Sequence, residues 1–504
     1  MKKNKKKILY SIYSALFIGI CLVPAVTMPL TSKGGTAENR RLSEMPKVKT
    51  EDGSINTEFF SEFETYFSEH FGLRSQLVTL DGQLRSQLMG TSSNDDVVVG
   101  KDDWLFYGET LNDYMNINTL SDRAINNIHH NLTLFSQYCD ENEVWFIFTV
   151  APNKNTIYPE YMPSRYTKAD SKDNLERFTE VYSAFDEEYF RLAVSSQLED
   201  AVKSQEMGHY RYCDLRETLL NAKNLYNQKE IPLYHKTDSH WNSLGALKGA
   251  QALIEHGFYH DPLPEATGNF TVKFDWSGDL AEMIYPADVP LDMQYYSGYD
   301  FTYDYVGRFR GFDDISIKTT NENGEGSLLM YRDSFGEAII PYIAESFASA
   351  EFTRTVPYRT DSIANGTAEV VVMEIVERNL GNLQKYAPVM PAPERDIQFT
   401  SAEYCGDVTV KCDESPQYSH IYGVLGEEFF GGDKVNIYVT VSGITYEAFN
   451  AFEDEKLGME GEICDRGFSL YIPKADQSLT TDMSGVTVTV VSENGKTVSD
   501  APIK

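Results

Sequence analysis

Basic residues are scarce in this chain of 504 residues, where 44 Lys and Arg stand against 76 Asp and Glu, giving a formal charge of −32. A surface this acidic repels phosphate backbones, which argues against nucleic-acid binding as the main activity. The chain also lacks internal repeats and low-complexity tracts. Its 41% hydrophobic and 13% aromatic residues exclude wholesale disorder. At ~150 residues per domain, the length suggests about two to four structural units.

Cysteine is sparse as well, and its spacing matches no zinc-binding pattern. Five of the six cysteines follow the N-terminal segment: Cys139, Cys213, Cys405, Cys412 and Cys464. A disulfide among the three C-terminal cysteines would be compatible with an exported protein, and its pairing stays open. The sequence predicts no metal site.

One segment near the N-terminus lacks charge altogether. Met1 to Lys7 contains five lysines, and Ile8 to Leu30 has no charged residue. A helix over this segment is roughly 35 Å long at ~1.5 Å per residue, enough to cross a hydrocarbon core of ~30 Å. The lysines favour a cytoplasmic N-terminus, which predicts a single-pass transmembrane anchor and an extracytoplasmic remainder. Cleavage as a signal peptide is the alternative, because Ala25 and Thr27 are small enough for a cleavage site.

The rest of the chain divides by pattern into three parts. After the anchor at 1–31, the polar segment 32–55 is typical of a stalk. Residues 56–390 alternate helical periodicity with continuous apolar strands, which indicates an α/β fold with a parallel sheet flanked by helices. After a proline-rich linker, residues 391–504 show short alternating runs separated by turns, which predicts a small C-terminal β-sandwich domain.

Local patterns predict individual elements within these parts. Apolar residues recur at helical spacing over Phe59–Leu88, and Asp95–Tyr107 is typical of a β-hairpin. The remaining predicted helices are Ser121–Glu141, Leu175–Lys203, a helix after Asp214 through Leu220, Ser243–His256 and Phe335–Phe347. The predicted core strands are Val144–Val150, Tyr210–Asp214, Ser327–Tyr331 and Glu369–Ile375.

A first candidate for chemistry lies just before the predicted helix at Ser243. Asp238 and His240 are two positions apart, so in an extended segment they point to the same side and the carboxylate can orient the imidazole. An alternative interpretation is a metal site formed by His235, Asp238 and His240. This pattern is not specific for a metal, because the sequence shows no fourth ligand elsewhere in the chain.

The second candidate is Ser334, at the turn between a predicted buried strand and a helix. Such a turn presents the hydroxyl at the carboxyl edge of the sheet, where open α/β sheets bind ligands. The alternative interpretation is that Ser334 is only the N-cap of the helix. A serine nucleophile needs a base and an acidic group that orients the base, and His240 with Asp238 supplies both types. The hypothesis requires that the two loops meet.

These residues resemble a known family. Asp238-Ser-His240-Trp241 and Arg332-Asp-Ser334-Phe335-Gly336 look like motifs of the DHHW protein family, which is related to alginate O-acetyltransferases of the AlgX and AlgJ type. Supporting pieces, in consistent order over about residues 37–380, are Ala37–Arg41, Gly100–Tyr107, Ala151–Lys154, Gly278–Leu280 and Val372–Asn379. One departure is Ser239, where the family name records a second histidine.

The resemblance implies an SGNH-hydrolase-like fold with the triad in the order Asp, His, Ser. It implies that His240, oriented by Asp238, deprotonates Ser334, which takes an acetyl group as an ester and passes it to a hydroxyl of a cell-surface polysaccharide. The Ser334 amide is the expected oxyanion donor. Further residues expected to line the site are Arg332, Trp241, Lys154, Glu377 and Arg378; structural ion pairs, or buried packing for the tryptophan, are the alternatives.

No cofactor is expected, and no acetyl-CoA motif is visible. The resemblance implies a separate membrane-bound O-acyltransferase that delivers acetyl groups outward. Two other functions stay open at this stage: a carbohydrate acetylesterase that uses the same triad with water as the acceptor, and a non-catalytic protein that binds or assembles cell-wall glycans. By analogy with AlgX, the C-terminal domain is a candidate carbohydrate-binding region.

Overall fold

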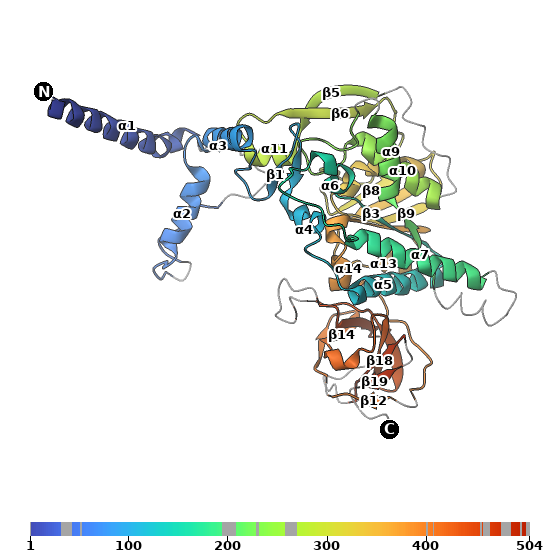
Figure 1. The fold of residues 1–504 in the computed structure, drawn as a ribbon. Coiled ribbons are helices and arrows are strands. Elements are labelled where there is room, and N and C mark those ends of the chain that lie inside the picture. The colour runs from blue at the N-terminus through green and yellow to red at the C-terminus, as the bar shows by residue number, and fades with distance from the viewer. Residues whose placement is uncertain are drawn as a thin grey trace.

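The structure of the chain is a computed structural model (Figure 1). It describes residues 2–31, 43–50, 53–193, 208–227, 231–257, 270–399, 402–406, 408–453, 456, 464–474, 485–493 and 496–499. Much of the expected stalk, at 32–42 and 51–52, lies outside the described residues.

A mixed sheet forms the centre of the molecule. Within the described residues it has seven strands in the order β4-β3-β11-β9-β10-β8-β7. The first five run parallel, and β8 and β7 continue the sheet in antiparallel pairing, which the sequence did not predict. The strands are β3 (Trp145–Ala151), β4 (Arg211–Cys213), β7 (Asp304–Tyr305), β8 (Ser316–Thr320), β9 (Ser327–Tyr331), β10 (Ser349–Thr353) and β11 (Val370–Val376).

Helices cover both faces of this sheet, as the apolar strands predict. Side chains alternate between the two faces, so Ile147 of β3 joins one hydrophobic core while Phe146 and Phe148 join the other. Helices α9 (Leu215–Asn227), α10 (Ser243–Gly257) and α12 (Ile340–Ser346) pack on the first core, and α5 (Asp122–Glu141) and α7 (Asn174–Ala193) pack on the second.

Two predicted helices are interrupted. The stretch Phe59–Leu88 divides into α2 (Phe59–His70) and α3 (Arg74–Met89), because Leu73 takes a left-handed conformation with φ of 62°. The helix predicted from Phe335 begins as a 3₁₀ turn, Phe335–Ala338, and continues as α12. Helical spacing alone does not reveal these breaks, since both halves keep the same periodicity.

Two hairpins flank the central layer. The predicted hairpin is confirmed as β1 (Val97–Val99) paired with β2 (Leu105–Tyr107). A second hairpin, β5 (Phe270–Ser277) with β6 (Leu291–Ser297), lies at the top of Figure 1, and the short helix α11 (Asp279–Ile284) connects its strands. This second hairpin was not among the predicted elements, although apolar and polar residues alternate strictly over Phe270–Ser277, which is the pattern of a strand.

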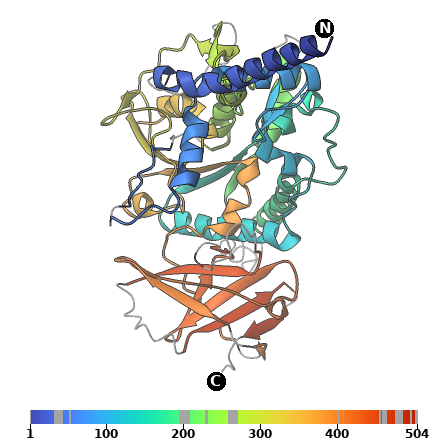
Figure 2. The ribbon, with the colours of Figure 1, turned by 90° about the vertical axis from the view of Figure 1, so that its left-hand side faces the viewer.

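The C-terminal part is rich in β-structure, as expected, and lies below α5 in both ribbon views (Figures 1 and 2). Its described strands form a five-stranded sheet, β12-β19-β18-β15-β16, and a three-stranded sheet, β13-β14-β17, which share one hydrophobic core. The strands are β12 (Glu403–Tyr404), β13 (Val410–Glu414), β14 (Tyr418–Val424), β15 (Val435–Val441), β16 (Ile444–Ala448), β17 (Gly467–Pro473), β18 (Thr487–Ser492) and β19 (Thr497–Ser499). The expected disulfide is not formed, since Cys405, Cys412 and Cys464 are free.

The N-terminal helix α1 (Lys2–Thr31) projects from the rest of the molecule (Figure 1). Its window Tyr10–Met28 has a mean hydropathy of 1.9 and none of it is buried. Among the described helices it is the one long and apolar enough to cross a membrane. A signal sequence has the same properties, so an anchor and a cleaved signal both fit this helix.

Candidate active site

The loop before α10 carries Asp238 and His240 and is fixed from within the protein. A bridge pairs Tyr234 with Trp241 across the loop. The ammonium group of Lys154, which is buried, donates to the backbone oxygens of His235, Lys236 and Asp238 at 2.9, 3.0 and 2.6 Å. Burial lowers the pKa of Lys154 to about 8. Lys154 therefore shapes the loop instead of lining the cleft.

The turn after β9 carries Ser334. The carboxylate of Asp333 accepts from the Phe335 amide at 2.9 Å and from the Val376 amide at 2.7 Å, which ties the turn to β11. Ser334 stands at the N-cap position of the 3₁₀ turn, yet its side chain makes no capping hydrogen bond. No hydrogen bond of the described residues uses its backbone N–H. Neither the hydroxyl nor the amide of Ser334 is therefore used to cap the 3₁₀ turn or to pair with the backbone.

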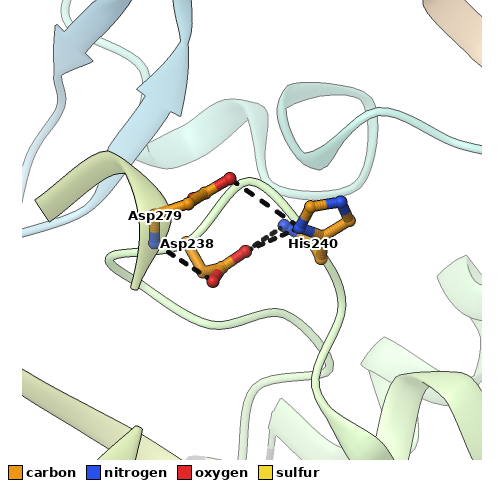
Figure 3. Close-up of side chains that lie close together, drawn as sticks. All are labelled: Asp238, His240 and Asp279. Carbon is orange, nitrogen blue, oxygen red and sulfur yellow. Dashed lines mark hydrogen bonds and ion pairs between the residues drawn. The ribbon is translucent and has the colours of Figure 1, made fainter. Parts of the chain in front are cut away.

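The two loops meet, and their polar side chains form one chain of hydrogen bonds. The Nδ1 atom of His240 donates to Oδ1 of Asp238 at 2.8 Å. The opposite ring nitrogen, Nε2, accepts from the Ser334 hydroxyl at 2.9 Å. Figure 3 shows the carboxylate and the imidazole side by side. These are the contacts that a nucleophile, its base and an orienting carboxylate require.

The surroundings of Asp238 keep it ionised. Burial would raise the pKa of this carboxyl, but the hydrogen bond and positive charge of His240 outweigh burial and hold the pKa well below its usual range. Its second oxygen accepts from Nε1 of Trp276 at 2.9 Å and from the amide of Asp279 at 3.2 Å. For His240 burial would lower the pKa, yet Asp238 raises it overall.

A second carboxylate, Asp279 at the start of α11, also faces His240 (Figure 3). Its Oδ2 atom lies 3.8 Å from Nδ1 of His240. It accepts from the hydroxyl of Ser239 at 2.5 Å, and that hydroxyl lies 3.1 Å from the same Nδ1. Ser239 thus links the second carboxylate to the imidazole. The motif Gly278–Leu280 was the sequence signal that contained this residue.

Asp238, His240 and Asp279 place three candidate ligand atoms within 4.8 Å of one another. Protein donors already occupy the carboxylate oxygens: Asp238 accepts from His240 and Trp276, and Asp279 accepts from Ser239. Carboxylate oxygens that already accept hydrogen bonds from the protein are suited to orient the imidazole, and not to coordinate a cation. His235, the third ligand of the metal-binding reading, stacks on Trp276.

His240 and Ser334 open into a cleft of about 380 Å³. Aromatic side chains dominate its lining: Trp276, Tyr295, Tyr296, Phe301, Phe312 and Tyr342. Polar groups are few and include Gln294, Ser297 and Glu337. A mostly aromatic cleft with a small number of polar groups is typical of a site for a small molecule or a sugar.

Other expected lining residues have structural contacts. Trp241 is 2% exposed and donates from Nε1 to the Phe335 oxygen at 3.0 Å, so it packs beneath the turn that carries Ser334 and also borders the cleft. The Arg332 guanidinium is buried and donates to the backbone oxygens of Phe312 and Asp314 at 2.5 and 3.0 Å.

At the end of β11, Glu377 accepts from the amide of Asn153 and the hydroxyl of Thr156, both at 2.7 Å, and therefore braces the β3 loop. The neighbouring Arg378 is partly exposed, with its guanidinium carbon 5.7 Å from the ring centre of Phe335. Of the five expected lining residues, Trp241 borders the cleft and Arg378 is partly exposed beside the turn that carries Ser334.

The chain matches no protein-family model and no curated protein. Similar solved structures do exist. They include Bacillus cereus PatB1 with a sulfonyl adduct, at 18% identity and a TM-score of 0.38 over 56% of this chain and 97% of that one. The O-acetyltransferase domain of Pseudomonas putida AlgJ is 17% identical, with a TM-score of 0.32 over 57% and 92% of the two chains. A DHHW family protein from Eubacterium siraeum is 16% identical, with a TM-score of 0.32 over 52% and 86%.

Proposed function

We propose that this chain is an extracytoplasmic O-acetyltransferase that moves an acetyl group through Ser334 onto hydroxyls of a cell-surface polysaccharide. The observation that carries the proposal is the unbroken hydrogen-bond chain from Asp238 through His240 to Ser334 at the mouth of an aromatic cleft. The motif resemblance to the DHHW family gives the reaction class. One similar structure is described as an O-acetyltransferase domain, and the proposal extends that activity to this chain.

In the first half of the reaction, Nε2 of His240 takes the proton of the Ser334 hydroxyl while Oγ bonds to the acetyl carbonyl carbon. The Ser334 amide stabilises the negative charge that develops on the carbonyl oxygen. The bond to the donor's leaving group then breaks, and the imidazolium gives its proton to that group. Asp238 balances the positive charge of His240 during this step.

In the second half, a hydroxyl of the acceptor attacks the acetyl-Ser334 ester. His240 takes the hydroxyl proton, the ester bond to Oγ breaks, and the imidazolium returns the proton to Ser334. The cycle restores the enzyme and consumes no cofactor. Water in place of the sugar hydroxyl gives an esterase with the same residues, so the acceptor decides between the two activities.

The proposal includes the wider architecture. Residues 56–390 form an SGNH-like catalytic domain, because Ser334 follows a parallel strand and meets a base on another loop at the sheet edge. Residues 391–504 form a β-sandwich domain that is a candidate for glycan binding. The helix α1 anchors the chain with its catalytic part outside the cytoplasm. A membrane-bound O-acyltransferase supplies the acetyl groups.

Turnover of a chromogenic acetyl ester tests the catalytic assignment. We expect the wild-type protein to release the chromophore and Ser334→Ala to lose at least about a thousandfold in rate. Equal turnover by the variant would remove the serine from the mechanism, and no turnover by either protein would favour a glycan-binding role. Mass spectrometry of an added surface glycan then separates transfer from hydrolysis, since an esterase leaves the glycan unacetylated.

A further inference from the structure

The hairpin β5–β6 contributes a face to the catalytic cleft. In its register Thr271 pairs with Tyr296, and Lys273 pairs with Gln294. Residues opposite each other in an antiparallel pair share a face, and alternate residues along a strand do so as well. Tyr296 and Gln294 therefore lie on one face with Lys273, and both line the cleft. Phe274 pairs with Met293 on the other face, which also carries the cleft-lining Tyr295, but Phe274 itself is not part of the cleft lining.

Tyr296 is exposed yet firmly held. The residue is 41% exposed. The ammonium group of Lys273 lies 4.7 Å from its ring centre, and its hydroxyl donates to Asp275 at 3.1 Å. A cation on a ring and a bonded hydroxyl restrict the rotation of the side chain. The result is a rigid aromatic surface flanked by one donor group and one acceptor group.

The same hairpin reaches the triad at its other end. A register shift after Phe274 brings Trp276 opposite Asp292. Trp276 stacks on His235, with ring centres 4.7 Å apart, and donates to Asp238. The cleft thus extends from the reacting serine along the hairpin to Tyr296.

We propose that Tyr296, Lys273 and Asp275 form a second sugar subsite beside the reacting position, so that the acceptor is a glycan chain bound through more than one sugar unit. A pyranose ring packs its apolar face on the tyrosine, while its hydroxyls donate to Asp275 and accept from Lys273. One positive and one negative group favour a sugar without net charge at this subsite. The inference rests on the proposed function and specifies its acceptor.

The test measures acetyl transfer to a surface glycan from a strain that lacks this protein, offered intact and after hydrolysis to monosaccharides. For the wild-type protein we expect kcat/KM per sugar unit to be higher for the intact glycan. In Tyr296→Ala the KM for the intact glycan should rise roughly tenfold, as on loss of one aromatic anchor. The deciding readout is the ratio of kcat/KM per sugar unit for the intact glycan to that for monosaccharides, which should fall in Tyr296→Ala.

Phe274→Ala is the matched control, because Phe274 is 66% exposed on the opposite face of the same strand. It should leave the KM for the intact glycan unchanged, and Tyr296→Phe should retain most of the affinity because it keeps the ring. Equal transfer to intact glycan and monosaccharides, or a rise in KM shared by Phe274→Ala, would overturn the subsite while the proposed function stands. Ester turnover without transfer to any glycan would instead contradict the transferase and the subsite together.

Discussion

At the scale of single residues, the arrangement around His240 decides the chemistry. Two carboxylates lie near the same ring nitrogen, Asp238 at 2.8 Å and Asp279 at 3.8 Å. The first is buried and accepts from the ring, whereas the second reaches it through the hydroxyl of Ser239. Both negative charges favour the imidazolium, and this is why the pKa of His240 is raised in spite of burial.

This charge pattern predicts a shift in the pH dependence of Asp279→Asn. His240 acts as a base only when neutral, so activity falls as the pH drops through its pKa. In the wild-type protein the acid limb of kcat/KM should lie above the ordinary imidazole value of about 6.5. Removing the charge of Asp279 lowers the pKa of His240 and moves this limb to lower pH. The measurement is a pH profile of chromogenic-ester turnover.

The matched control for that profile is Asp288→Asn, an exposed carboxylate in the segment after α11. Its acid limb should coincide with that of the wild-type protein. A limb that stays in place in Asp279→Asn, or that moves to higher pH, would show that Asp279 does not act on His240.

At the scale of elements, the close approach of α11 to the catalytic loop depends on Gly278. A side chain at this position would overlap the carbonyl group of Thr237, and that carbonyl accepts from the Ala281 amide of α11 at 3.1 Å. The missing Cβ lets α11 bring Asp279 beside Ser239 and Asp238.

Gly278→Ala should therefore separate α11 from the catalytic loop. We expect a loss of about 1–3 kcal/mol in the free energy of unfolding and at least a tenfold loss of ester turnover. Gly249→Ala in α10 is the control, since its Cβ would lie 3.5 Å from the nearest atom, of Ile339, and alanine favours a helix. Denaturant unfolding and turnover assays measure both effects, and equal results for the two variants would contradict the proposed packing.

The elements that the sequence predicts best are those with strong apolar patterns. The strand Ser327–Tyr331 and the helix from Ser243 have the predicted positions. The hairpin β5–β6 was not predicted, although Phe270, Val272, Phe274 and Trp276 alternate with polar residues as in a strand. Most of β5 is exposed in the structure, so these apolar residues do not mark a strand of the buried central sheet.

The same reasoning applies to the candidate site. Asp238, His240 and Ser334 could be proposed from residue type and loop position, and their hydrogen bonds follow from the way the sheet aligns two loops. The roles of Trp276 and Asp279 could not be proposed in this way, although the motif Gly278–Leu280 contains Asp279, since their contacts depend on how α11 and β5 fold back over the loop of Asp238 and His240. Buried roles for Trp241 and Arg332 likewise follow from packing across distant segments.

At the scale of the whole molecule, buried amides join the C-terminal β-structure to the α/β part. Asn450 donates to Asn127 at 3.1 Å and to the Val435 oxygen at 2.9 Å, and its backbone amide donates to Asn131 at 2.8 Å. The side chain of Asn131 returns a bond to the Asn450 oxygen. The C-terminal part is thus fixed to α5 by hydrogen bonds shielded from water.

Asn450→Ala should weaken this junction by about 1–3 kcal/mol, because it removes the side-chain donor to Asn127 on α5 and to the Val435 oxygen, while the two backbone bonds with Asn131 remain. We expect faster proteolysis between the two parts and unchanged ester turnover per folded molecule. Asn126→Ala is the control, since Asn126 lies on the same helix and bonds to Asp122 within it. Limited proteolysis with both variants measures the effect, and equal cleavage would argue against the junction.

The most direct test of the central claim is to look for the acetyl group on the protein. The wild-type chain and His240→Ala are incubated with an acetyl ester, quenched in acid, digested and analysed by mass spectrometry. The proposed mechanism predicts one acetyl group on the peptide that contains Ser334 in the wild-type protein and almost none in His240→Ala. Ester turnover without acetylation of Ser334, or acetylation at the same rate in both proteins, would contradict a triad built from Asp238, His240 and Ser334.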